Sequence, residues 1–342
     1  MIRLLDLTKK ILSTSIKLIL GNCIIQPLSC LTPKKKIVVF ITRFGNTFEG
    51  NLKYLFLYLN SRNDLGDTKF YFLTESKKIR EELQTAGLPV LYYYRLSTFL
   101  ILLRSQAVVV DGNEWAGKLR HQLLIRTAKF QLWHGSGMKT VGKLKPRLQK
   151  QSPLIKKISD IVGLHPCYDI LSMNSQVQVE TRAHAFNYKK ILINGQPRND
   201  VLFVEDSEPY LAGADVETFH KAVDYKKQGY KLVIYSPTHR HPSKEYDVVK
   251  GAMDIAELNR FAEQHKIVFI FKYHQKTRKE HQYDISSADN MIEYNKYKDV
   301  YPLFAYIDLM ITDYSSIFVD FMVLGRPVVF FPFDYNHYVN TE

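Results

Sequence analysis

Residues 309–331 read LMITDYSSIFVDFMVLGRPVVFF and hold the clearest strand, turn, helix and strand pattern in the chain. An apolar run opens it, and Ser315 in the following turn is a typical helix N-cap. The GRP sequence ends that helix, and a second buried strand follows. Free backbone N–H groups, two serine hydroxyls and the positive helix end would together bind an anion. The alternative is an ordinary βαβ turn, so the rest of the chain decides.

Strand and helix patterns alternate along the rest of the chain, which predicts a doubly wound α/β fold. Short apolar runs predict strands at residues 37–41, 70–73, 89–92, 107–110, 129–133, 168–173, 231–235 and 267–271. Helical spacing predicts helices at residues 51–60, 75–86, 98–104, 116–127, 176–186, 216–227, 254–264 and 300–305.

The polar segment Asp206–Gly213 is the best candidate for a linker. A chain of 342 residues is long enough for two domains with cores of their own. We therefore predict domains at residues 34–205 and 206–342, after an N-terminal segment of residues 1–33. Neither domain carries a GxGxxG or GxxxxGK[ST] motif, so no dinucleotide or P-loop site is predicted.

The first twenty residues have the pattern of an amphipathic helix, with leucines and isoleucines at helical spacing and basic residues between them. That pattern suits a helix lying in a membrane interface. The longer apolar stretch Ile11–Leu31 approaches the length of a membrane span, but Lys17 and Pro27 interrupt it. No small-residue cleavage site stands out, which argues against a signal peptide. A first helix packed into the core is the alternative.

The net charge of +13 predicts a polyanionic partner: nucleic acid, an anionic membrane or a phosphate-rich substrate. Seven cations follow one another without an acid: Lys139, Lys143, Lys145, Arg147, Lys150, Lys156 and Lys157. Leucines and an isoleucine lie among them, which favours a membrane surface over nucleic acid, although such runs are usually just solvated. The three cysteines form no CxxC pair, which fits a reduced, cytosolic location and predicts no metal site.

Polar residues follow several predicted strands, and ligand sites in open α/β sheets lie at the carboxyl ends of strands. His134 follows strand 129–133, and its neighbour Gly135 lets a ligand approach the backbone closely. A neutral imidazole there can take a proton near pH 7, whereas a structural histidine at a strand end is the alternative.

In the second domain three predicted strands end in polar clusters, whose members are Thr238, His239, Arg240, Lys272, His274, Asp313, Ser315 and Ser316. Convergence of these clusters at one sheet edge would surround a pyrophosphate with bidentate and point-charge donors. A further turn at Arg198, Asn199 and Asp200 places a cation between turn residues. The set predicts an enzyme that handles phosphate groups.

As an ordered set, these motifs resemble the CDP-glycerol glycerophosphotransferase family, which builds teichoic acids and related capsule polymers. The resemblance covers most of the chain from residue 37 onward and rests on LWHG (132–135) with Lys139, GQPRND (195–200), SPTHR (236–240), KYH (272–274) and TDYSSI (312–317) with Asp320. It implies two Rossmann-like domains in a glycosyltransferase-B arrangement, with no cofactor. It also implies a CDP-glycerol or CDP-ribitol donor and a monotopic protein on the cytoplasmic face of the membrane. The basic run and the N-terminal helix favour a lipid-linked acceptor, either a saccharide or a polyol phosphate.

By position, His134 and His274 correspond to the family's two essential histidines. The resemblance gives donor-binding roles to Arg240, Ser315, Ser316 and Asp320, and we expect further substrate contacts from Gly135, Arg198, Asn199, Asp200, Thr238, Lys272 and Asp313. The chain departs from the family pattern at Gln275, where proline is usual, and at Ser136-Gly137. It also ends at Glu342, where members usually continue, so we expect a shortened second domain.

Two other functions fit parts of this pattern. One is a glycosyltransferase of the same fold that uses a nucleotide sugar, and the other is an inactive membrane-bound scaffold. A nucleic-acid binder explains the net charge but not the ordered motifs. Residue types do not separate glycerol from ribitol as the donor alditol, and they leave the oligomeric state open.

Overall fold

The computed structural model describes residues 12, 15–43, 45–135, 142–144, 150, 152–161, 165–204, 206–239, 252–277, 279 and 282–341. The chain divides into two compact units. Unit 1 holds Met1–His134 and Met138–Arg198, and unit 2 holds Gly135–Gly137 and Asn199–Glu342. The units thus divide at Arg198, ahead of the polar segment in which the linker was expected.

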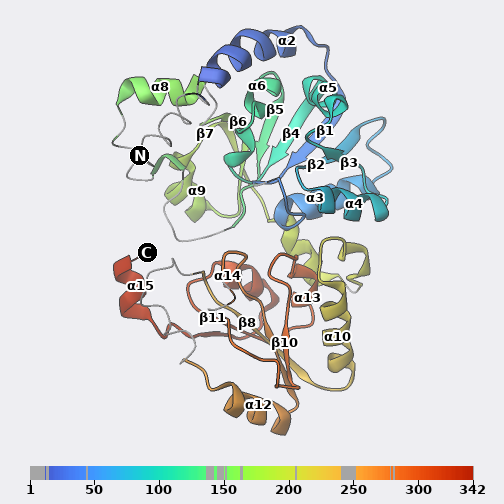
Figure 1. Cartoon of the computed structure of the whole chain (residues 1–342), viewed down its shortest axis with the longest axis vertical. Helices are drawn as coiled ribbons and strands as arrows, with labels where there is room; N and C mark the ends of the chain where they lie inside the picture. The colour runs from blue at the N-terminus through green and yellow to red at the C-terminus, as the bar shows by residue number, and fades with distance from the viewer. Residues whose placement is uncertain are drawn as a thin grey trace. The chain divides into compact units, whose positions relative to one another are not determined.

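Unit 1 is built on a seven-stranded parallel sheet with the order β3-β2-β1-β4-β5-β6-β7, which can be followed in Figure 1. Its strands are β1 (Lys35–Ile41), β2 (Lys69–Thr74), β3 (Val90–Tyr92), β4 (Ser105–Val110), β5 (Ala128–Gln131), β6 (Cys167–Met173) and β7 (Asn187–Ile193). Its main helices are α3 (Gly50–Ser61), α4 (Lys77–Thr85), α5 (Leu96–Arg104), α6 (Arg120–Leu123), α8 (Pro153–Ile161) and α9 (Gln176–Arg182).

The apolar run of β1 explains its central place in this sheet. Val39, Phe40 and Ile41 are completely buried, as expected of a strand covered by helices on both faces. Polar N-caps mark where helices begin. The Ser76 hydroxyl accepts from the N–H of Ile79 at the start of α4, and the Ser175 hydroxyl accepts from the N–H of Gln178 at the start of α9.

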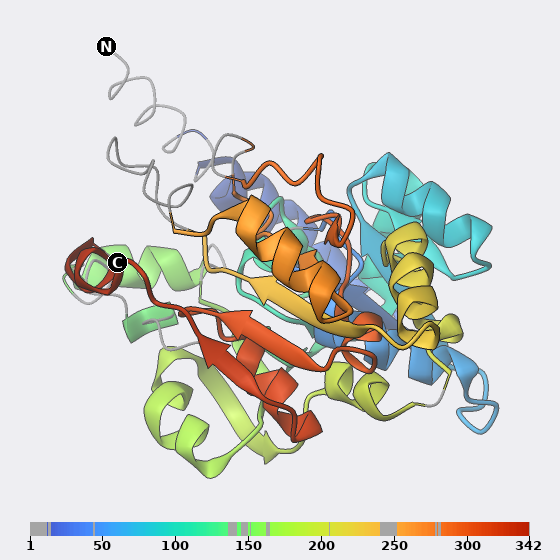
Figure 2. The same ribbon diagram turned by 90° about the horizontal axis from the view of Figure 1, so that it is seen from below.

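Unit 2 is built on a five-stranded parallel sheet with the order β10-β9-β8-β11-β12. Its strands are β8 (Lys231–Ser236), β9 (Ile267–Phe271), β10 (Met291–Glu293), β11 (Leu309–Thr312) and β12 (Val328–Phe330). Helix α12 (Ile255–Gln264) packs beside β9, and α10 (Val216–Lys227) packs beside β8, as Figure 2 shows. The remaining helices are η5 (Pro197–Phe203), α13 (Tyr301–Phe304), α14 (Ile317–Phe321) and α15 (Tyr335–Thr341).

In both units the strand order reverses beside the first strand, between β1 and β4 and between β8 and β11. In doubly wound sheets, ligands bind outside the carboxyl ends of the strands at such a reversal point. The topology therefore directs attention to the residues that follow β1 and β4 in unit 1, and β8 and β11 in unit 2.

Some sequence-based predictions are wrong in detail. The helix expected at residues 116–127 is reduced to α6 and a 3-10 turn at Glu114–Ala116. Ser316, rather than Ser315, occupies the N-cap of α14, and its side chain makes no capping hydrogen bond. No prediction was made for the strands β7 and β10 or for the helices α8 and α15. Strand β10 has only three residues, and β7 and α15 carry many polar residues, so periodicity is weak there. Helix α8 is strongly amphipathic, but its lysines were interpreted only as part of the basic run.

The N-terminal segment is helical over its described part, as a π-helix at Lys17–Ile25 followed by α2 (Gln26–Leu31). It docks on unit 1 through Ile25, which packs against the core, and through Ser29, whose hydroxyl donates to the Leu123 carbonyl at 2.9 Å. Most of the amphipathic helix predicted for the first twenty residues lies outside the described residues, so that prediction is not confirmed. Among the described residues no helix is both long and apolar enough to cross a bilayer.

Candidate active site

His134 lies just beyond the carboxyl end of β5, in a turn with unusual backbone angles. Trp133 has φ 56° and Gly135 has φ 151°. A non-glycine residue with positive φ persists only where its surroundings hold it. Gln131 provides that support, because its Oε1 accepts from the Trp133 N–H at 3.0 Å and its Nε2 donates to the Gly112 carbonyl at 3.2 Å.

Three further buried polar residues hold the same turn. The Asn51 amide donates to the Trp133 carbonyl at 2.9 Å and to Gln196 Oε1 at 3.3 Å. Arg198 lies in this network, and its Nη1 donates to the His134 carbonyl at 2.8 Å. Arg198 therefore supports the backbone of His134, a role that its position in a turn motif did not reveal.

The imidazole of His134 has a polar partner on each nitrogen. Its Nδ1 lies 2.6 Å from the carbonyl oxygen of Asp111, and its Nε2 lies 2.9 Å from Arg43 Nη1. A carbonyl oxygen only accepts and a guanidinium only donates. Nδ1 therefore carries the proton, and the Nε2 lone pair accepts from Arg43.

The electrostatic surroundings favour neutral His134. Burial, and after it the cation of Arg43, lowers the pKa of His134 to about 3. The imidazole is therefore neutral at pH 7, but it is a weak proton acceptor while Arg43 stays beside it. The sequence led us to expect an imidazole that takes a proton near pH 7. In this arrangement burial and the Arg43 cation oppose protonation of the ring, and the sequence had revealed neither of them.

Arg43 and Asp111 were missed by the sequence reasoning. Asp111 is buried, and its Oδ1 accepts from the backbone N–H of Arg43 at 2.6 Å. Burial raises the pKa of its carboxyl group to about 7. These residues follow the ends of β4 and β1, which flank the reversal point of the sheet. The carboxyl-end rule that identified His134 would have found them too.

Replacing Asp111 with asparagine should change how stability depends on pH. The folded pKa of about 7 lies above the ordinary value of 3.8, so the folded chain holds a proton between these values that the unfolded chain has lost. Stability from this group is therefore lost as pH rises from about 4 to about 7, by at most about 4 kcal/mol. The Asp111→Asn variant lacks this loss, so its stability relative to wild type should be greater at pH 8 than at pH 4.5.

Urea unfolding followed by tryptophan fluorescence measures this difference, because both tryptophans, Trp115 and Trp133, lie in unit 1. The lowered pKa of His134 makes the folded state more stable as pH rises over part of this range, which opposes the effect of Asp111. Wild type and Asp111→Asn both contain His134, so its effect cancels in the comparison. Asp160→Asn, at an exposed position of α8, is the matched control. If the difference in free energy of unfolding between Asp111→Asn and wild type were the same at the two pH values, Asp111 would titrate with an ordinary pKa.

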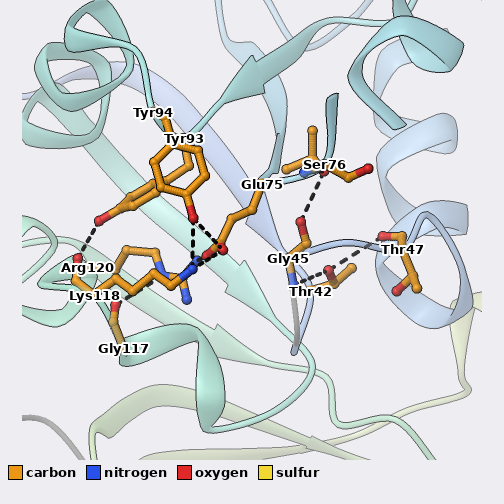
Figure 3. Close-up of polar contacts among 11 residues, drawn as sticks. Thr42, Gly45, Thr47, Glu75, Ser76, Tyr93, Tyr94, Gly117, Lys118 and Arg120 are labelled. Carbon is orange, nitrogen blue, oxygen red and sulfur yellow. Dashed lines mark hydrogen bonds and ion pairs between the residues drawn. The ribbon is translucent and has the colours of Figure 1, made fainter. Parts of the chain in front are cut away.

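A second polar cluster of unit 1 surrounds Glu75, just beyond β2 (Figure 3). Arg120 Nη1 lies 2.7 Å from Glu75 Oε1, and Lys118 Nζ pairs with Oε2. Lys118 and Leu119 both have positive φ, at 53° and 66°. The ion pairs to Glu75 hold this turn in a conformation that its residue types do not favour, so we interpret the cluster as structural.

The structure brings the polar clusters of unit 2 together at one edge of its sheet. β9, β8 and β11 are parallel neighbours, so their carboxyl ends lie side by side. The Asp313 carboxylate accepts from the Thr238 N–H at 2.8 Å, which ties the turn after β11 to the turn after β8. The rings of His239 and His274 stack with centroids 5.4 Å apart, which ties β8 to β9.

Lys272 and His274 present donors at this edge. Lys272 Nζ donates to the Lys296 carbonyl at 2.9 Å and lies 5.8 Å from the centre of the Tyr294 ring. The Lys276 N–H donates to His274 Nδ1 at 3.2 Å. Neutral His274 therefore carries its proton on Nε2, and that N–H is suited to donate to a phosphate oxygen.

The remaining predicted residues of unit 2 lie on several elements. Ser315 and Ser316 form the half-buried turn between β11 and α14. Asp320 is buried, and its Oδ2 accepts from the Tyr301 hydroxyl at 2.7 Å. Asn199 and exposed Asp200 lie on η5. Arg240 lies outside the described residues. His134 belongs to unit 1 and His274 to unit 2. If both are essential, as the resemblance implies, they would have to act on one substrate, and that stays a prediction.

The predicted membrane-binding cations are described only in part. Lys139, Lys145 and Arg147 lie outside the described residues, whereas Lys150, Lys156 and Lys157 are exposed. Lys143 differs, because it is half-buried and donates to the Asn187 side chain. Within the described ranges, no three histidine, cysteine, aspartate or glutamate side chains gather closely enough to hold a metal ion.

Comparison with known proteins identifies one family and several of its members. The family model described as CDP-glycerol:poly(glycerophosphate) glycerophosphotransferase matches residues 24–342. The teichoic acid ribitol-phosphate polymerase TarK of Staphylococcus aureus is 26% identical over 90% of this chain and 57% of its own length. A teichoic acid poly(glycerol phosphate) polymerase of Bacillus subtilis is 24% identical over 98% of this chain and 44% of its own. The chain thus spans about half the length of these two relatives.

Solved structures show the same fold. A variant of the wall teichoic acid polymerase TagF superposes with a TM-score of 0.65 and 20% identity, over 98% of this chain and 81% of that chain. A UDP-GlcNAc 2-epimerase from Neisseria meningitidis superposes with a TM-score of 0.52 and 13% identity, over 86% and 82% of the two chains. The predicted fold class of two Rossmann-like α/β domains is confirmed.

Proposed function

The chain belongs to the CDP-glycerol:poly(glycerophosphate) glycerophosphotransferase family, and from this premise we propose that it transfers an alditol phosphate from a CDP-alditol to an acceptor hydroxyl. The donor is CDP-glycerol or CDP-ribitol, the acceptor is lipid-linked, and CMP is released. The polymer is a teichoic acid or a related phosphodiester polymer of the cell envelope.

The edge of unit 2 is the observation that carries this proposal. Three neighbouring strand ends there gather a lysine, two stacked histidines and a serine turn around one place. These groups donate hydrogen bonds, and lysine adds a positive charge, which is what a diphosphate needs. Among the relatives, the structure of a TagF variant was solved after a soak with CDPG, and its fold matches this chain with a TM-score of 0.64.

In the proposed reaction the acceptor oxygen attacks the phosphorus that carries the alditol. The bond from that phosphorus to the CMP oxygen breaks, CMP takes the electron pair, and the hydroxyl proton passes to Nε2 of His134. Lys272 and His274 neutralise the charge that grows on the leaving phosphate, together with Arg240 and the hydroxyls of Ser315 and Ser316. Phosphoryl transfer depends chiefly on positioning and electrostatics, which these residues can provide.

We further propose that unit 1 binds the cytoplasmic face of the membrane. Exposed apolar residues mark the described part of the N-terminal segment, among them Ile19, Ile24 and Leu28. Helix α8 adds exposed Leu154 and Ile155 beside Lys156 and Lys157. Apolar residues beside cations are the pattern of a surface that binds anionic lipid. A surface of this kind brings the enzyme to a lipid-linked acceptor.

The double variant Lys156→Gln/Lys157→Gln should bind anionic vesicles about 30-fold more weakly. Each lysine near an anionic bilayer contributes about 1 kcal/mol, so two contribute about 2 kcal/mol. Sedimentation with phosphatidylglycerol-containing vesicles at low salt measures the change. Lys77→Gln/Lys78→Gln, an exposed pair on α4, is the matched control. Equal losses in both variants would mean that net charge acts without a dedicated surface.

Nucleotide release tests the proposed reaction. The protein is incubated with a lipid-linked acceptor and, in separate reactions, with CDP-glycerol, CDP-ribitol and UDP-sugars. We expect CMP from at least one CDP-alditol and no UDP. Release of UDP would support the nucleotide-sugar alternative. Absence of both release and donor binding would support the scaffold.

A further inference from the structure

Trp133 has a backbone conformation that its residue type does not favour. Its φ of 56° lies in the left-handed region, which glycine adopts freely and which is unfavourable for a residue with a side chain. The conformation persists because Gln131 accepts from the Trp133 N–H and Asn51 donates to its carbonyl. Backbone strain of this kind collects at functional sites, where the conformation contributes to the mechanism.

The left-handed turn places the rings of two consecutive residues side by side. In an extended strand, the side chains of neighbouring residues point to opposite faces of the sheet. Trp133 and His134 break this alternation, since their ring centroids are 4.1 Å apart and their planes differ by 35°. The indole also contacts the buried Phe186 ring, with centroids 4.8 Å apart and planes at 72°, a preferred aromatic geometry. The core therefore holds the indole against the imidazole.

We infer that Trp133 is a positioning residue for the proposed base, because its indole fixes the plane of the His134 imidazole. Asp111 and Arg43 contact the two ring nitrogens, at 2.6 and 2.9 Å. Two such contacts define an axis, about which a ring can still tilt. A flat ring packed against the imidazole removes this freedom, so the Nε2 lone pair keeps one direction. This inference rests on the proposed function and adds to it a residue that acts through His134.

The indole also suits the charge that the proposed transfer creates. The imidazole is neutral at rest and becomes a cation when it accepts the hydroxyl proton. Burial and the charges of Arg43, Arg198 and Arg182 oppose that change by lowering the pKa of His134. A cation within about 6 Å of an aromatic ring is attracted to its face, and indole attracts it more strongly than phenyl. We therefore expect phenylalanine at position 133 to keep the imidazole in place but to restore only part of the rate.

Nuclear magnetic resonance of ¹⁵N-histidine-labelled protein at pH 7 tests the positioning role without turnover. The His134 signals are assigned by their loss in His134→Asn, and the separation of the two ring-nitrogen shifts reports how far one tautomer predominates. Wild type should show one tautomer, protonated on Nδ1. Trp133→Gly keeps the left-handed turn but removes the indole, so its two shifts should move toward each other. Trp133→Phe should keep the wild-type separation.

Transfer kinetics give the second readout. Trp133→Gly should lower kcat about 10–100-fold, because a misplaced catalytic group loses rate on that scale. It should leave KM for the CDP-alditol unchanged, since unit 2 supplies the proposed donor contacts. Trp133→Phe should recover part of the lost rate. Tyr58→Ala, which removes an exposed ring from α3, is the control and should match wild type in both measurements.

Wild-type nitrogen shifts or an unchanged kcat in Trp133→Gly would overturn the inference. Circular dichroism shows whether this variant folds. If it does not, Trp133→Leu, which keeps an apolar side chain without a flat ring, takes its place in the comparison with Trp133→Phe. If wild type released no CMP from any donor, the proposed function would fail, and the nitrogen shifts would still decide whether Trp133 orients His134.

Discussion

Replacing His134 with asparagine is expected to slow alditol-phosphate transfer by about 10²–10⁴-fold, the usual contribution of a general base. The asparagine amide can still donate to the Asp111 carbonyl, as Nδ1 of His134 does at 2.6 Å, but it has no basic nitrogen to accept the hydroxyl proton. CDP-alditol binding should be largely retained, because unit 2 supplies the proposed donor contacts. The measurements are the rate of CMP release and the heat of CDP-glycerol binding.

His184→Asn is the matched control, since His184 is an exposed histidine of the same unit. It should transfer at the wild-type rate. Unchanged turnover in His134→Asn would remove His134 from the mechanism. Loss of both binding and turnover, accompanied by a lower unfolding midpoint, would assign it a structural role in the turn that Gln131 and Asn51 support.

Replacing Lys272 with methionine is expected to weaken CDP-glycerol binding about 10–150-fold. A hydrogen bond to a charged group contributes about 1.5–3 kcal/mol, and methionine keeps the apolar stem while removing the charge. The Lys272 side chain is held at the edge of the sheet by the Lys296 carbonyl at 2.9 Å, so its ammonium group is already positioned. Calorimetry at two salt concentrations measures the loss, which should shrink at high salt because screening weakens the wild-type contact.

Lys227→Met is the control for this change, because Lys227 lies exposed at the end of α10, where the chain turns into the amino end of β8. It should bind CDP-glycerol like wild type. Equal affinities in wild type and Lys272→Met would exclude Lys272 as a phosphate ligand. If wild type itself bound no donor, the scaffold alternative would gain support over any assignment within the site.

Much of the fold follows from local sequence patterns. The apolar runs at residues 37–41 and 267–271 become buried central strands because each is covered on both faces. Edge elements were harder to predict, since β7 carries two adjacent lysines, Lys189 and Lys190, and β10 has only three residues. The N-cap of α14 was misplaced by one residue because two serines stand together there, and either can begin a helix.

The candidate site shows a sharper limit of sequence reasoning. His134 was recognisable because it ends a predicted strand in a glycine turn. The partners that set its tautomer and basicity, Arg43 and Asp111, lie 91 and 23 residues away along the chain. Only the strand order brings them together, by placing β1, β4 and β5 side by side. Polar contacts between distant residues of this kind depend on the order of strands in the sheet, and the sequence patterns used here do not give that order.

The central claim is that this chain moves an alditol phosphate from a CDP-alditol to a hydroxyl. Mass spectrometry of the products from CDP-glycerol and a lipid-linked acceptor that ends in glycerol phosphate tests it most directly. We expect each product to be heavier than its acceptor by whole glycerol phosphate units, with one CMP released per unit added. An acceptor of unchanged mass, or one that gains glycerol without phosphate or a sugar instead, would contradict the claim.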